Sequence, residues 1–149
     1  MIATRNAIKT LITHNYTDFL TVYVGFPLAI RVEDVAVNNA RKGGLGTYCK
    51  TQDYKWHSSA QNIATLEFGI ELYLDATGEG DVNDRGAENE EWLWSRMEGI
   101  RDLLFDTDNA VIVADTTIIK APVKIESGIM EGSIRQLRMT ITYDKRVTR

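Results

Sequence analysis

Apolar residues recur at helical spacing in two segments of the chain. Ile8, Leu11 and Ile12 lie three and four residues apart, which predicts a first helix over residues 4–14. A second helix is predicted over residues 87–106, where the apolar stripe consists of Leu93, Met97, Ile100 and Leu104. Acidic residues open this second helix, where the helix dipole favours negative charge.

Alternation of apolar and polar residues predicts the strands. The clearest strand covers residues 65–74, and its core-facing residues would be Leu66, Phe68, Ile70, Leu72 and Leu74, with the intervening residues facing water. Shorter patterns predict a strand at 20–24, a weaker one at 28–37, and two or three closing strands within 111–143. Since strands follow one another without intervening helices, we expect one α+β domain over residues 1–149, mainly an antiparallel sheet packed against two helices.

The segment 38–62 has no such periodicity. It is polar, it is rich in glycine, and it carries the aromatic residues Tyr48, Tyr54 and Trp56. An irregular stretch of this length is uncommon in a compact domain unless it is functional. We therefore predict a long flexible arm or loop between strands, whose aromatic residues pack on something such as a neighbouring chain.

Composition narrows the class of protein. The chain has 149 residues, 44% of them hydrophobic and 26% charged, which is typical of a globular domain. It contains no apolar run long enough for a membrane span, and polar residues interrupt its start, so a secretory leader is not expected. The net charge of −4 disfavours a nucleic-acid coat protein. Basic residues prevail in 1–64 and acidic residues in 65–149, which would allow copies to associate head to tail.

Candidate chemistry is sparse. Cys49 and His57 lie eight residues apart and could form a nucleophile pair, but no orienting partner is evident. A calcium loop beginning at Asp75 has the required glycine but ends on Gly86 where a bidentate glutamate is needed. The glycine run in KGGLGTY lacks the ending of a phosphate-binding loop and suggests flexibility. We expect no enzyme activity, no metal and no cofactor.

The order of elements resembles the tail-terminator proteins of long-tailed bacteriophages. The resemblance spans an N-terminal helix, a strand, a flexible arm, an alternating strand, an acid-started helix (ENEEWLWSRMEGIRDLLFD) and a closing antiparallel hairpin that ends in ITYDKR. It implies a structural virion protein, made in the host cytoplasm, that forms a ring, commonly six-fold, on the end of the tail tube. Such a ring stops tube polymerisation and offers the head-joining surface.

The resemblance also suggests roles for the charged residues. A basic arm that meets an acidic face of the next copy would make a head-to-tail contact that can close into a ring. We predict that the residues in contact with a neighbour are Arg41, Lys42, Lys50, Lys55 and Trp56. We predict that the residues facing the lumen, where they would repel DNA so that it passes without stable binding, are drawn from Asp75, Glu79, Asp81 and Asp84.

Three other functions remain open from the sequence. A head-completion or neck adaptor would share the ring but bind the portal side. A small single-stranded nucleic-acid module would use the aromatic residues of the arm between its basic residues. A small enzyme would require Cys49 with His57, or the acidic loop predicted at residues 75–86, to act. Trp92 and Trp94 add one structural prediction: they lie about 200° apart on the second helix, so at least one is partly exposed or covered by another segment or subunit.

Overall fold

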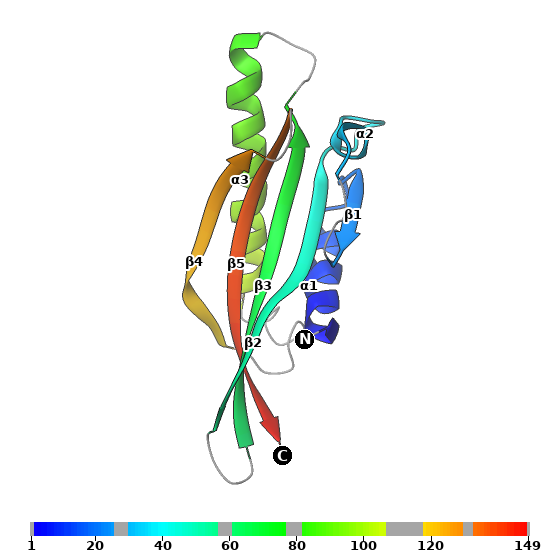
Figure 1. Cartoon of the computed structure of the whole chain (residues 1–149). Helices are drawn as coiled ribbons and strands as arrows, with labels where there is room; N and C mark the ends of the chain where they lie inside the picture. The colour runs from blue at the N-terminus through cyan, green and yellow to red at the C-terminus, as the bar shows by residue number, and fades with distance from the viewer. Residues whose placement is uncertain are drawn as a thin grey trace.

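The computed structural model describes residues 2–25, 30–56, 61–76, 82–106, 118–129 and 133–148, and it has the predicted α+β architecture. Five strands form one sheet in the spatial order β1-β2-β3-β5-β4 (Figure 1). The first pair, β1 with β2, is parallel, and the other neighbours are antiparallel. The strand bounds are β1 (Thr21–Val24), β2 (Gly44–Trp56), β3 (Gln61–Asp75), β4 (Ile118–Ile129) and β5 (Ile134–Thr148).

Two long helices cover one face of this sheet. They are α1 (Ile2–Asn15) and α3 (Val82–Phe105), and they confirm the two predicted helices. Helix α1 extends beyond its predicted bounds at both ends, whereas α3 begins at residue 82 instead of 87 and ends at 105 instead of 106. In Figure 1 α1 lies behind β1 and β2, and α3 lies behind β3 and β5. A third, short helix, α2 (Val32–Val35), was not predicted. No described helix is long and apolar enough to cross a membrane.

The core lies between the sheet and the two long helices. The predicted stripes of β3 and α3 are buried there, together with Ile8 and Ile12 of α1 and Leu137, Met139 and Ile141 of β5. Burying each such side chain contributes about 1.5–3 kcal/mol relative to leaving it in water. This apolar layer fixes the position of α3 across the middle strands.

The segment 38–62 is not an arm or loop over most of its length, so that prediction was wrong. Residues 44–56 form β2, which pairs with both β1 and β3, and residues 61–62 begin β3. Gly44 and Gly46 lie in β2, and each is in close contact with an aromatic ring of a neighbouring strand. The ring of Tyr23 from β1 lies beside Gly44, and the ring of Tyr73 from β3 lies beside Gly46. The two glycines therefore make room for aromatic rings of neighbouring strands.

The sheet face opposite α1 and α3, which we call the open face, is less exposed than predicted. Gly69, Glu71 and Tyr73 of β3 point to this face and are buried. Val35 of α2 packs on Tyr73 and Ile134, so the segment around α2 covers one end of the open face. The weaker strand predicted at 28–37 is thus replaced by α2, and its first two residues lie outside the described part.

One end of the sheet projects beyond both long helices (Figure 1). Here β2, β3 and β5 remain paired as far as Trp56 with Asn62 and Gln61 with Thr148. We call this projecting part, residues 55–56, 61–63 and 146–148, the β-extension. It is the structured counterpart of the arm expected from the sequence.

Candidate functional site

The structure separates the basic residues predicted to contact a neighbour. Arg41 is exposed and forms a two-residue bridge with Asn38. The Lys42 ammonium lies 5.5 Å from the ring centroid of Trp92, on the helix-covered side of the sheet. Lys50 donates to Thr140 Oγ1 at 3.2 Å on the open face. The three therefore do not form one basic patch.

Two more residues of that set, Lys55 and Trp56, belong to the β-extension. Their backbones are paired with Ile63 and Asn62, and their side chains are outside the described part of the chain. Their predicted contact with a neighbour stays a prediction.

Of the four acidic residues predicted to line a lumen, the structure describes the side chain of one, Asp75. Asp75 ends β3, is buried, and its Oδ1 accepts a hydrogen bond from Ser133 Oγ at 2.9 Å. It therefore fixes the start of β5 against the end of β3. Asp84 lies in the first turn of α3, but its side chain, like residues Glu79 and Asp81, lies outside the described part.

The open face contains a buried carboxylate that the sequence did not single out. The Glu71 side chain is 7% exposed. Its Oε1 accepts hydrogen bonds from Tyr48 OH at 3.1 Å and from Arg138 Nε at 2.8 Å, and its Oε2 accepts one from Tyr73 OH. Burial raises the pKa of both tyrosines, and the nearby Glu71 charge adds to this, so both phenols remain neutral donors. The carboxylate is engaged on both oxygens and holds three strands together.

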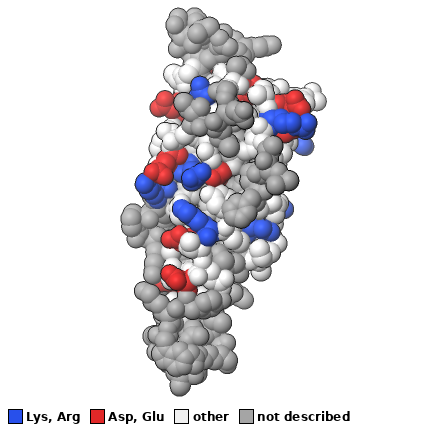
Figure 2. All heavy atoms as spheres, viewed as in Figure 1, with Lys and Arg blue, Asp and Glu red and all other residues white. Residues whose placement is uncertain are grey.

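Charges of both signs surround this carboxylate. Arg138 on β5 stands in register between Glu126 on β4 and Glu71 on β3. Beside it, Lys124 Nζ lies 2.6 Å from Glu126 Oε1. Figure 2 shows this face, where blue and red side chains of the described residues lie side by side. Charges of mixed sign on this face do not favour binding to a polyanion.

A second polar and aromatic cluster lies between α1 and α3. The Arg96 guanidinium sits over the rings of Tyr16, Phe19 and Trp92, at 4.6, 5.4 and 5.2 Å from their centroids. It also forms a two-pronged ion pair with Asp18, whose second contact, Nη2 to Oδ2, is 2.8 Å. The ion pair holds the pKa of Asp18 below its ordinary value, mainly through the Arg96 hydrogen bond.

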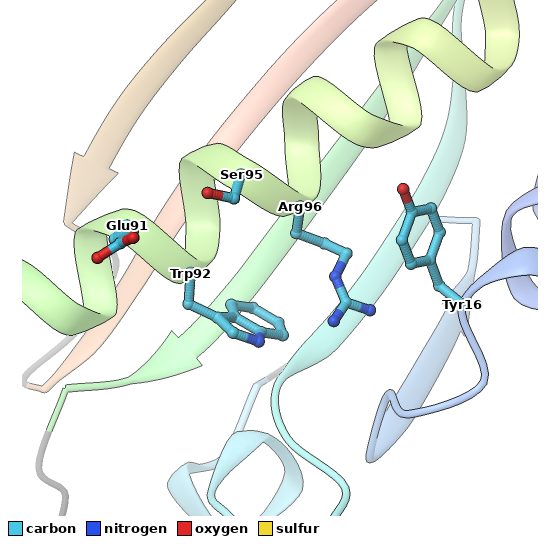
Figure 3. Close-up of a pocket in the computed structure, with 5 residues that line it drawn as sticks. All are labelled: Tyr16, Glu91, Trp92, Ser95 and Arg96. Carbon is cyan, nitrogen blue, oxygen red and sulfur yellow. The ribbon is translucent and has the colours of Figure 1, made fainter.

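Next to this cluster the surface is hollowed by about 390 Å³. The residues that line the hollow are Tyr16, Glu91, Trp92, Ser95 and Arg96. Figure 3 shows the Arg96 side chain pointing between the rings of Trp92 and Tyr16. Because Arg96 is already paired with Asp18, the hollow offers mainly aromatic surface and the Glu91 carboxylate. Aromatic residues of this kind are typical of protein–protein contacts.

The two tryptophans of α3 agree with their prediction. Trp92 and Trp94 are both half-buried and both pack against the edge of the core. Because they lie on different sides of α3, each residue is partly accessible on a different side of the helix.

The residues considered for catalysis or metal binding are not gathered into a site. Cys49 is half-buried on the helix-covered side of β2, where it packs against the core, and His57 lies outside the described residues. The twelve residues from Asp75 include the first turn of α3, so they do not form a loop. Within the described ranges, no group of three or more His, Cys, Asp or Glu could hold a metal ion.

Sequence reasoning missed the cluster around Glu71 for an identifiable reason. Its members come from three strands, and cross-strand neighbours depend on a register that the sequence does not reveal. An available signal was Glu71 itself, a charged residue in the middle of the most apolar strand.

No model of a known protein family matches this chain, and no curated protein matches its sequence.

Proposed function

We propose that this chain is a structural subunit of a phage tail, a tail terminator. Copies would form a ring, commonly six-fold in such proteins, on the end of the tail tube, stop its polymerisation and offer the head-joining surface. The observation that supports this most is the β-extension, in which paired strands continue beyond the helices that bury the rest of the sheet.

A ribbon of strands without a packing layer is marginally stable in water by itself. Pairing of β2, β3 and β5 nevertheless continues to Trp56, Asn62 and Thr148. No described helix covers this ribbon, and a surface on another subunit or on the tail tube would supply a packing layer. We place Lys55 and Trp56 in that contact, with Arg41 and Lys42 at the opposite end of β2 meeting a second neighbour.

Two features of the described residues favour assembly over catalysis. Among the described residues the most buried carboxylate, Glu71, already accepts three hydrogen bonds, so most of its accepting capacity is used within the sheet. The hollow at Trp92 is lined by two aromatic residues, by Glu91 and Ser95, and by an arginine that is already paired. Such surfaces bind proteins well without performing chemistry.

In a ring on the tail tube, DNA would pass through the centre without stable binding. We propose that Glu79, Asp81 and Asp84, next to the start of α3, face this lumen and repel phosphates. Asp75 is left out, because its carboxylate is buried against Ser133.

The experiment compares the wild-type chain with a variant that lacks the β2 and β3 parts of the β-extension. Replacing residues 55–63 by Asn-Gly joins Tyr54 to Ala64, which are paired partners, through a two-residue hairpin turn. Both proteins are added to polymerising tail-tube protein, and tube length and tube ends are recorded by electron microscopy. We expect wild type to cap tubes at one end and limit their length, and the variant to fold but leave tubes uncapped. Equal capping by the variant, or no capping by wild type, would contradict the proposal.

The alternatives give different outcomes in the same preparation. A neck adaptor would form rings that bind a portal complex and leave tube ends free. A single-stranded nucleic-acid module would bind oligonucleotides with an affinity that falls steeply with salt.

A further inference from the structure

The edge strand β1 exposes apolar side chains. It is one of the two edge strands of the sheet, so its outer backbone groups pair with no strand among the described residues. Val22 and Val24 are 38% and 50% exposed. Their register with Leu45 and Thr47 directs them to the helix-covered side of the sheet. An unpaired strand edge with exposed valines is a common place for association between chains.

Helix α1 adds positive charge to this edge. Ile2, Arg5 and Lys9 follow at spacings of three and four residues and therefore share one side of α1. The Arg5 guanidinium lies next to Gly25 at the end of β1. The helix contains no Asp or Glu, so this charge is not compensated within it. We call the group Ile2, Arg5, Lys9, Val22 and Val24 the β1 edge.

The solvent side of α3 has the opposite character. Its exposed residues, at alternating spacings of three and four, are Glu88, Glu91, Ser95, Glu98 and Asp102. This α3 ridge is about 21 Å long at 1.5 Å per residue. Among the described residues, the only ion pair of the α3 ridge is between Asp102 and Arg101. Arg96 of the same helix pairs with Asp18 and therefore does not neutralise the ridge.

The α3 ridge also offers apolar contact on both sides. By helical geometry Trp92 and Trp94 flank it, about 80° to either side of its centre line. Both indoles are half-buried, and Trp92 borders the hollow described above. Acidic residues in the middle and aromatic residues at the flanks match a surface that carries cations and exposed valines.

We infer that the β1 edge of one copy packs against the α3 ridge of the next copy. This inference rests on the proposed assembly of the chain with copies of itself. The two surfaces occupy different parts of the subunit, since α1 lies behind β1 and β2 whereas α3 lies behind β3 and β5 (Figure 1). The contact is therefore head to tail and can close into a ring. In this contact the two valines become buried against Trp92 and Trp94. Arg5 and Lys9 pair with the acidic residues of the α3 ridge.

The test is a charge exchange across the contact. Arg5→Glu with Lys9→Glu, or Glu91→Lys with Glu98→Lys, should each raise the dissociation constant of assembly roughly tenfold or more, because like charges then face each other. Combining all four changes should restore most of the lost affinity. Sedimentation or native mass spectrometry measures the assembly, and circular dichroism verifies folding.

The matched control lies on the open face. Lys124→Glu makes the same change of charge as Lys9→Glu, at a side chain that is 74% exposed, and should leave assembly unchanged. Val24→Ser should weaken assembly while leaving monomer stability almost unaffected. If wild type assembles and the two reversed pairs assemble equally well, this contact is wrong but the proposed function stands. If wild type stays monomeric even on tail tubes, both are wrong.

Discussion

The ring of Tyr48 lies against the backbone of Gly69, its directly paired neighbour across β2 and β3. A Cβ at Gly69 would overlap the end of this ring. The absence of a side chain therefore lets Tyr48 lie across the open face and donate to Glu71. Glycine is required here by a close approach between strands.

Gly69→Ala should destabilise the fold by about 1–3 kcal/mol, because the added methyl group must displace the Tyr48 ring. Chemical denaturation measures the free energy of unfolding. Gly128→Ala in β4 is the control, since a Cβ there would make only ordinary contact with Gln136 Oε1 at 3.6 Å. We expect it to change stability by less than about 0.5 kcal/mol. Equal effects of the two substitutions would disprove the role assigned to Gly69.

The pair formed by Glu71 and Arg138 should show measurable coupling. Glu71 is almost fully buried, whereas the Arg138 side chain is 46% exposed, so solvent screens part of the attraction. A double-mutant cycle with Glu71→Gln and Arg138→Met should give a coupling of about 1 kcal/mol in the free energy of unfolding. A coupling near zero would mean that the attraction between these two side chains does not stabilise the fold.

Two buried tyrosines should respond oppositely to loss of the hydroxyl. Tyr73 OH donates to Glu71, whereas Tyr143 OH is buried without a hydrogen-bond partner among the described residues. Tyr73→Phe should cost about 1–3 kcal/mol, because a hydrogen bond to a charged group is lost. Tyr143→Phe should be neutral or stabilising by about 1 kcal/mol, because a buried polar group without a partner is removed. Thermal unfolding of both variants measures this, and destabilisation by Tyr143→Phe would reveal a partner for that hydroxyl.

The ion pair between Asp18 and Arg96 should make stability depend on acid pH. Because the pKa of Asp18 is lower in the folded state than in the unfolded chain, its contribution is present above about pH 4 and is lost as the pH falls through the folded-state pKa. Asp18 is 44% exposed, so the contribution at neutral pH stays below about 1 kcal/mol. The stability difference between wild type and Asp18→Asn should shrink as the pH is lowered from 6 to about 2. A difference that does not change with pH would contradict this assignment.

The control for that series is Asp102→Asn. Asp102 pairs with Arg101 at a position where its side chain is 72% exposed. The substitution should change stability by less than about 0.5 kcal/mol over the same pH range.

The sequence was sufficient for the parts of the fold that follow from local periodicity. The buried stripe of α3 from Leu93 to Leu104 and the alternation of β3 from Leu66 to Leu74 both appear as predicted. In each, one side of the element faces a single apolar layer, so the pattern of burial repeats with the geometry of the element itself. The antiparallel pairing of β4 with β5 also agrees, whereas the pairing of β3 with β5 was not predicted.

The missed features depend on contacts between distant residues. Strand β2 was obscured because its glycines at 44 and 46 face aromatic rings from β1 and β3, an arrangement that a strand's own sequence does not reveal. Tyr73 was expected to face water, but Val35 covers it from a segment almost forty residues earlier. The Glu71 cluster likewise exists only once three strands are in register.

We propose that this chain acts by assembling with copies of itself on a tail tube. The most direct measurement is the mass of the chain, by native mass spectrometry and light scattering, alone and after addition of tail tubes, with microscopy of the tube ends. The claim predicts a closed particle, an integral multiple of 16.8 kDa, located at one end of each tube. A monomer at every concentration, with tube ends left bare, would contradict it.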